Sequence, residues 1–280
     1  MKIRNCSQGP AVGASARNHL CLLGALGIAV GSAGAATYTD VLGDGQGSAN
    51  LLRDISSATI NNDANNFYIT INLNPSANIA TGGSFNYAIG ITSGAGGDTS
   101  ANATTHGNPY GRAISIDSSL GGMTDWIGIF GAGGAGSVAS PFTSYGFNDY
   151  AWNTNGSSLT WSKINQVASG QPISGTPPSS ISLTVPMSDF ASNLSLTPGT
   201  TFSFDILSTG TSGNQTAYDS LVVQGPIQSG TFNGTAQFND TMLFSYTIVA
   251  VPEPGTLALF GIGVASFIVR RRRASAPSRH

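Results

Sequence analysis

The chain has 280 residues and a formal net charge of −2 at pH 7, but its charges are unevenly distributed. Between residues 37 and 250, twelve aspartates stand against Arg53, Arg112 and Lys163, which gives this part a net charge of −9. Non-specific nucleic-acid binding needs Lys and Arg to neutralise phosphates, so a nucleic-acid partner is disfavoured. Both cysteines, Cys6 and Cys21, precede this part, which therefore has no disulfide, thiolate metal site or cysteine nucleophile.

Residues 1–36 have the order of parts of a signal peptide. Basic residues precede the apolar run 20–30, and small residues follow at 32–36. We expect an N-terminal signal helix, export through the Sec translocon, and cleavage after Ala35 or Ala36.

The exported part, residues 37–250, reads as a series of short strands. The clearest is 67–73, where Phe67, Ile69, Ile71 and Leu73 alternate with polar residues. Asn155-Gly156 predicts a hairpin between the segments 147–152 and 159–164, because a type I′ turn needs two residues with positive φ. About ten such segments and no amphipathic helix predict an all-β domain, a single antiparallel β-sandwich of the jelly-roll or DOMON-like kind.

Asp40, Asp44 and Asp54 lie in a glycine-rich segment near the start of this domain. Calcium takes six to eight oxygen ligands, and glycines let a chain curl around the ion. The three aspartates are therefore a candidate calcium site, and no other cofactor is expected. The alternative is that each aspartate caps a turn by accepting hydrogen bonds from neighbouring amides.

The tryptophans Trp126, Trp152 and Trp161 are the candidate glycan-binding residues, because flat aromatic faces stack on sugars. Packing is the alternative for each of them. Trp152 and Trp161 flank the predicted hairpin, and a cross-strand pair would itself account for both.

Several short motifs resemble the DOMON-like sandwiches, which include family 9 carbohydrate-binding modules. They are the aspartates above with Asn62-Asp63, the segment 67–70 and the segment Gly121 to Gly128. The resemblance implies a sandwich fold, binding of carbohydrate, and a structural calcium near the first strand.

Catalysis is not expected. The exported part has a single histidine, His106, and no glutamate before Glu253. A nucleophile needs a base within hydrogen-bond reach, and one loop histidine makes no convincing triad.

Residues 251–280 combine three features in a fixed order. Pro252-Glu253-Pro254 precedes the uncharged run 256–269, and Arg270, Arg271, Arg272 and Arg273 follow. The run makes a helix of roughly 21 Å, short for a hydrocarbon core of about 30 Å. The arginines mark the cytoplasmic side and leave 274–280 as a cytoplasmic tail.

This order resembles the PEP-CTERM sorting signal of Gram-negative bacteria, here 251–273. The resemblance implies recognition of the tripeptide by exosortase, a membrane-embedded transpeptidase. The protein would be anchored transiently in the inner membrane, cut near Glu253, and then placed on the cell surface or in the extracellular matrix. An ordinary stop-transfer anchor with a proline-rich stalk is the alternative.

Two functions remain open for the domain. A non-catalytic module that binds exopolysaccharide predicts exposed tryptophans in a line or cleft. A purely structural component of the envelope or biofilm, without a small ligand, predicts that all three tryptophans are buried.

Overall fold

The structure is a computed structural model that describes residues 34–45, 51–79, 86–94, 96–99, 112–131, 144–153, 160–210, 216–225, 227 and 238–251. All of them belong to one compact unit, Ser32–Val251. Most of the predicted signal peptide lies outside the described residues. So do Pro252, Glu253 and Pro254, the run 256–269, the four arginines and the tail 274–280.

The described residues form β-strands and short 3₁₀ helices. The strands are β1 (Ala36–Thr39), β2 (Ile55–Asn62), β3 (Asn66–Leu73), β4 (Asn86–Thr92), β5 (Ile114–Ile116), β6 (Asp125–Gly131), β7 (Ser144–Asn153), β8 (Thr160–Gly175), β9 (Pro178–Pro186), β10 (Thr201–Thr209), β11 (Ala217–Ser220), β12 (Phe238–Asp240) and β13 (Phe244–Thr247). The 3₁₀ helices are η1 (Leu51–Arg53), η2 (Ser118–Leu120) and η3 (Met187–Phe190). Within the described part, no helix has the length and apolar character that crossing a membrane requires.

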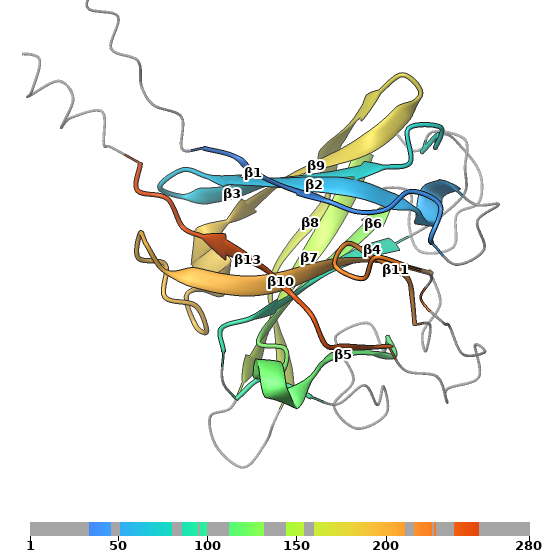
Figure 1. Ribbon diagram of the computed structural model, residues 1–280. Helices are drawn as coiled ribbons and strands as arrows, with labels where there is room; N and C mark the ends of the chain where they lie inside the picture. Colours follow the sequence, from blue (N-terminus) through green and yellow to red (C-terminus); the bar gives the residue numbers. More distant parts are fainter. Residues whose placement is uncertain are drawn as a thin grey trace, which may run out of the picture. The chain divides into compact units, whose positions relative to one another are not determined.

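Eleven strands form one sheet in the order β1-β2-β3-β9-β8-β7-β6-β4-β10-β11, with β13 also paired to β10. Its neighbours pair antiparallel throughout, whereas β5 and β12 form a separate parallel pair. In Figure 1, β1, β2, β3 and β9 make one layer, and β10 and β13 lie in the opposite one. The predicted all-β antiparallel fold is confirmed.

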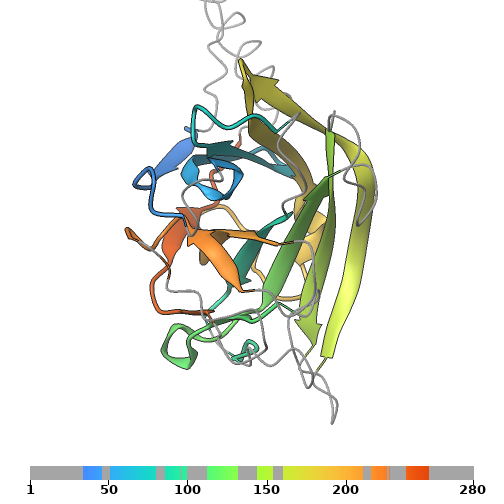
Figure 2. The same ribbon diagram turned by 90° about the vertical axis from the view of Figure 1, so that its right-hand side faces the viewer.

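The long strand β8 joins the two layers. Residues 160–172 of β8 pair with β7, and residues 173–175 pair with β9. Figure 2 shows β8 curving along one side of the domain from one layer to the other. On the far side, the hydroxyl of Tyr38 in β1 donates to the carbonyl of Ser245 in β13 at 2.7 Å. The sheet is therefore nearly closed.

The main core fills the space between the layers. In β3, Phe67, Ile69, Ile71 and Leu73 are buried, while the residues between them are half-buried or exposed. The predicted strand and its inward face are confirmed. Fully burying a side chain of this size contributes about 1.5 to 3 kcal/mol, so the alternation also determines which face of the strand points inward.

A second, smaller core covers the other face of β4, β6 and β10. Ala88, Trp126 and Leu207 pack there with Ile114 and Ile116 of β5. These central strands are therefore buried on both faces.

Candidate metal centre

Three carboxylates from distant parts of the sequence converge at one place in the domain. Asp40 and Asp44 lie in the loop after β1, and Asp219 lies in β11. Each offers one oxygen, and these oxygens all lie within 4.8 Å of one another. Asp44 is 7% exposed and Asp219 is fully buried, so the cluster is largely shielded from water.

The loop that carries Asp40 and Asp44 is held against the start of β2. Both oxygens of Asp54 accept from the Gly43 amide at 3.0 Å, and Oδ2 also accepts from Asn74 Nδ2 at 2.6 Å. Gly43 has φ +88°, a conformation that glycine adopts without strain. A Cβ on Gly45 would lie 3.3 Å from the Arg53 carbonyl oxygen, so the loop approaches η1 closely.

Asp219 is fixed by main-chain amides of two strands. Its Oδ2 accepts from the Ile55 amide at 2.6 Å, and its Oδ1 accepts from the Ser220 amide at 3.0 Å. Since Ile55 begins β2 and Ser220 ends β11, this carboxylate links the two layers of the sheet at the cluster.

The other two carboxylates retain oxygens without well-formed hydrogen bonds. Asp40 Oδ1 accepts from the Val41 amide at 2.7 Å and from Gln224 Nε2 at 3.0 Å. Its Oδ2 is buried and has no hydrogen-bond partner among the described residues. Neither oxygen of Asp44 has a well-formed hydrogen bond there, although the main-chain amides of Asp44 and Gly225 act on this carboxylate and lower its pKa. A buried carboxylate without compensation is costly, and it is stabilised either by a proton or by a cation.

The pKa values of the cluster reflect this crowding. Burial is the main cause that raises the pKa of Asp40 to about 7 and that of Asp219 to about 8. The charge of Asp44 adds to both shifts, and burial also raises the pKa of Asp44 itself. Near neutral pH the carboxyls of Asp40 and Asp219 are therefore partly protonated, unless a bound cation stabilises their ionised forms.

The structure brings together two of the three predicted calcium ligands and adds a third. Asp40 and Asp44 join the cluster, whereas Asp54 is not part of it and instead braces the loop by accepting from Gly43 and Asn74. Asp219 was not among the predicted ligands, because nothing in the local sequence pairs β11 with a loop more than 170 residues earlier.

The tryptophans are mostly internal. Trp126 is 1% exposed and Trp152 is 4% exposed, while Trp161 is half-buried and donates from Nε1 to Asp98 Oδ2 at 3.0 Å. The predicted cross-strand pair is confirmed, since Trp152 and Trp161 are opposite each other with ring centroids 5.4 Å apart. A stacking surface formed by all three tryptophans is not present.

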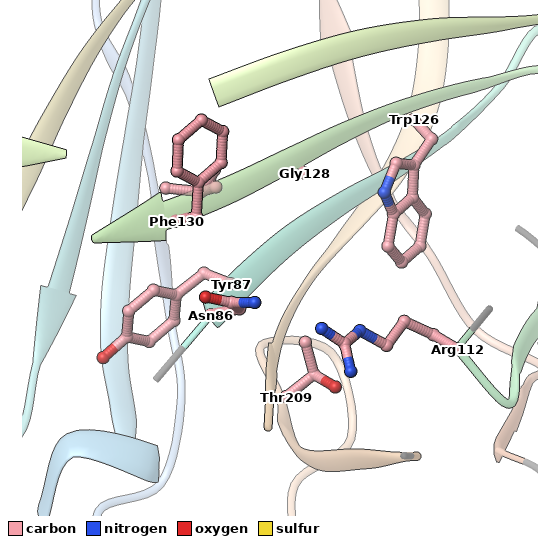
Figure 3. A pocket seen from close by; sticks show the side chains of 8 residues that line it. Asn86, Tyr87, Arg112, Trp126, Gly128, Phe130 and Thr209 are labelled. Carbon is pink, nitrogen blue, oxygen red and sulfur yellow. The ribbon is translucent and has the colours of Figure 1, made fainter. Parts of the chain in front are cut away.

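A small cavity lies beside Trp126. Asn86, Arg112, Trp126 and Thr209 surround it (Figure 3). Its volume is about 10 Å³, close to the space that one water molecule requires. It is too small for a sugar ring.

Fold and site together define an all-β domain with a largely buried cluster of three carboxylates. Comparison with known proteins identifies a sorting signal: residues 250–273 match the family model described as the PEP-CTERM protein-sorting motif. The chain thus carries a PEP-CTERM sorting motif, as predicted, and is an exported surface protein processed by exosortase. No curated protein and no solved structure matches the chain, so the DOMON-like resemblance remains a prediction.

Proposed function

We propose that the β domain is a non-catalytic structural component of the cell envelope or extracellular matrix, held together by a calcium ion. The sorting motif supports the surface location. Entry through the Sec translocon belongs to the same proposal and rests on the signal-like residues 1–36.

The observation that carries the calcium proposal is Asp44. Its carboxylate is buried, has no well-formed hydrogen bond among the described residues, and offers an oxygen within 4.8 Å of oxygens of Asp40 and Asp219. Calcium is a hard cation that prefers several carboxylate oxygens, and extracellular modules bind it with dissociation constants of about 10⁻⁴ to 10⁻³ M. Asp40, Asp44 and Asp219 would hold the ion, which would neutralise the charges that burial disfavours.

The ion would connect the two layers of the sheet. The loop after β1 comes from one layer, and β11 pairs with β10 in the other. Because Asp219 also accepts from the Ile55 amide, an ion on Asp219 joins the loop, β2 and β11 at a single point.

The burial of Trp126 and Trp152 favours the structural role over exopolysaccharide binding through tryptophans. A flat aromatic side chain binds a sugar only when its face is accessible, and these two faces are packed inside the domain. Binding of exopolysaccharide would need a different surface.

Thermal unfolding of the purified chain tests the calcium proposal. At pH 7.5 we expect 5 mM CaCl₂ to raise the Tm by several degrees above its value in EDTA, and 5 mM MgCl₂ to raise it much less. Magnesium demands near-ideal octahedral geometry and dehydrates reluctantly, so it is the matched control. Equal Tm values in calcium and EDTA would contradict the proposal.

A further inference from the structure

The outer face of β3 and its neighbours is a surface of hydroxyl and amide groups. Tyr68, Thr70 and Asn72 of β3 point away from the core, opposite to the buried residues Phe67 to Leu73. Strands β2 and β9 flank β3 in antiparallel register and present their own outward residues beside these three. We call the outward residues of these three strands the β3 outer face.

Hydrogen bonds between neighbouring side chains fix the orientations of the polar groups on this face. Asn72 donates from Nδ2 to Ser57 Oγ at 3.0 Å and accepts at Oδ1 from Ser180 Oγ at 2.7 Å. In the next row, the hydroxyls of Thr70 and Ser182 are 3.2 Å apart. Rows of this kind repeat about every 6.6 to 6.8 Å along the strands, and the strands lie about 4.8 Å apart. The polar groups therefore form a regular array.

Tyr68 supplies an aromatic ring at one end of the array. Tyr68 is 39% exposed. Of the large hydrophobic side chains that are exposed in the described part, it alone is aromatic. Asn61 of β2 and Thr184 of β9 lie opposite it. A flat, accessible ring next to hydroxyl and amide groups is a chemical match for a sugar, which has C–H surfaces as well as hydroxyls.

The ring is held in place before any ligand arrives. The Tyr68 hydroxyl donates to Asp63 Oδ2 at 2.6 Å. Asp63 Oδ1 in turn accepts from the amides of Asn65 and Asn66, each at 2.7 Å. A side chain ordered in this way loses little conformational freedom on binding, which favours affinity.

The charge of the face limits the ligand class. The outward residues of β2, β3 and β9 named above are Ser, Thr, Asn and Tyr, and the nearest charge is negative, the Asp63 carboxylate on the Tyr68 hydroxyl, in an exported part with a net charge of −9. An anionic polymer would meet repulsion from the domain and no Lys or Arg on this face. The core of a protein interface is usually rich in large apolar residues, and this face offers the single ring of Tyr68.

We propose that the β3 outer face binds a neutral polysaccharide, with Tyr68 stacking on one sugar ring and Thr70 and Asn72 hydrogen bonding to hydroxyls further along the chain. The surface is the outer side of a sheet that extends along three strands, so it binds along a polysaccharide chain and not around a chain end. The inference uses the surface location given above but does not depend on the calcium ion.

Retention on insoluble neutral polysaccharides tests this inference. The full-length chain, purified in detergent, is passed over cellulose, curdlan, chitin and mannan, with alginate beads as the anionic comparison. We expect retention on at least one neutral polymer and none on alginate. Tyr68→Ala should weaken that retention about tenfold or more, as the loss of an aromatic hot-spot residue does.

Two further variants make the result specific. Thr70→Lys places a bulky charge in the middle of the face and should also reduce retention. Ile164→Ala is the matched control, because Ile164 is 45% exposed on β8, outside the face, and its retention should equal that of the wild type. Circular dichroism and the Tm in calcium verify that each variant is folded.

The inference is overturned if the wild type is retained on none of the neutral polymers, or if folded Tyr68→Ala is retained as well as the wild type. Asp219→Asn separates the two proposals. It removes a calcium ligand without touching the β3 outer face, so its retention should stay at the wild-type level while its gain in stability from calcium becomes much smaller.

Discussion

Replacing Asp219 with asparagine is the sharpest test of the carboxylate cluster. The substitution keeps the size of the side chain and removes one charge. The remaining oxygen can still accept from one of the two amides, Ile55 or Ser220, that now donate to the carboxylate. The stability advantage of the variant over the wild type should shrink when calcium is added, because the charge of Asp219 is a cost without the ion and a benefit with it.

The cost follows from the pKa of Asp219, which burial first and the charges of Asp40 and Asp44 next raise from 3.8 to about 8. A carboxyl whose pKa is raised in the folded state stabilises the fold below the unfolded value of 3.8. That contribution is lost as the pH rises through about 8. At pH 8 and without calcium, ionisation of this group therefore opposes folding by about 5 kcal/mol, at 1.36 kcal/mol per pH unit.

Asparagine avoids this cost but loses one hydrogen bond, worth about 1 kcal/mol. After allowance for relaxation of the crowded site, we expect Asp219→Asn to be more stable than the wild type in EDTA at pH 8 by about 2 to 4 kcal/mol. In calcium at fifty times its dissociation constant, the wild type should gain about 2 kcal/mol. The Tm of a domain of this size would then rise by about 4 to 8 °C. The variant should gain much less.

Urea denaturation followed by tryptophan fluorescence measures both effects in one series, at pH 5.5 and 8, with EDTA or calcium. At pH 5.5 Asp219 is protonated in the folded state, so the advantage of the variant should shrink. A variant that is less stable than the wild type in EDTA at pH 8, or that still responds fully to calcium, would refute the reasoning.

The remaining predictions concern the sorting motif and a second buried carboxyl. Glu253→Ala should leave an unprocessed, membrane-retained form, visible as a larger band in the membrane fraction, because exosortase would lose the carboxylate of its recognition motif; normal processing of this variant would argue against that role for Glu253. Asp149 is 1% exposed, and burial, followed by the hydrogen bond and charge of Asp189, raises its pKa to about 9. The wild type should therefore lose stability as the pH rises from 7 to 10. Asp149→Asn should lose less over the same range in urea denaturation, and equal losses would show that the ionisation of Asp149 does not limit alkaline stability.

The sequence by itself determined the clearest strands and their inward faces, because burial of apolar side chains every second residue is a local signal. Phe67 to Leu73 alternate in the sequence as they do in the fold. The hairpin pair of Trp152 and Trp161 was also predictable, since a short turn determines which residues lie opposite each other. The sorting motif needed no fold, because exosortase substrates carry it as a contiguous segment.

Only the tertiary structure decided what those strands bring together. Asp219 meets Asp40 and Asp44 because β11 pairs with β10 at the end of the sheet where the loop after β1 packs, and strand order is not encoded in local alternation. Asp54 was predicted as a ligand from its nearness in the sequence, but the fold places it outside the cluster, where it accepts from Gly43 and Asn74.

Only the tertiary structure decided which outward-facing side chains are exposed to water. Trp126 alternates as any half-buried strand residue does, and it is buried because β5 packs over the outer face of β6. Tyr68 alternates in the same way, but it is exposed and pinned by Asp63. Period-two alternation separates the two faces of a strand, but whether the outward face meets water depends on what the rest of the chain places over it.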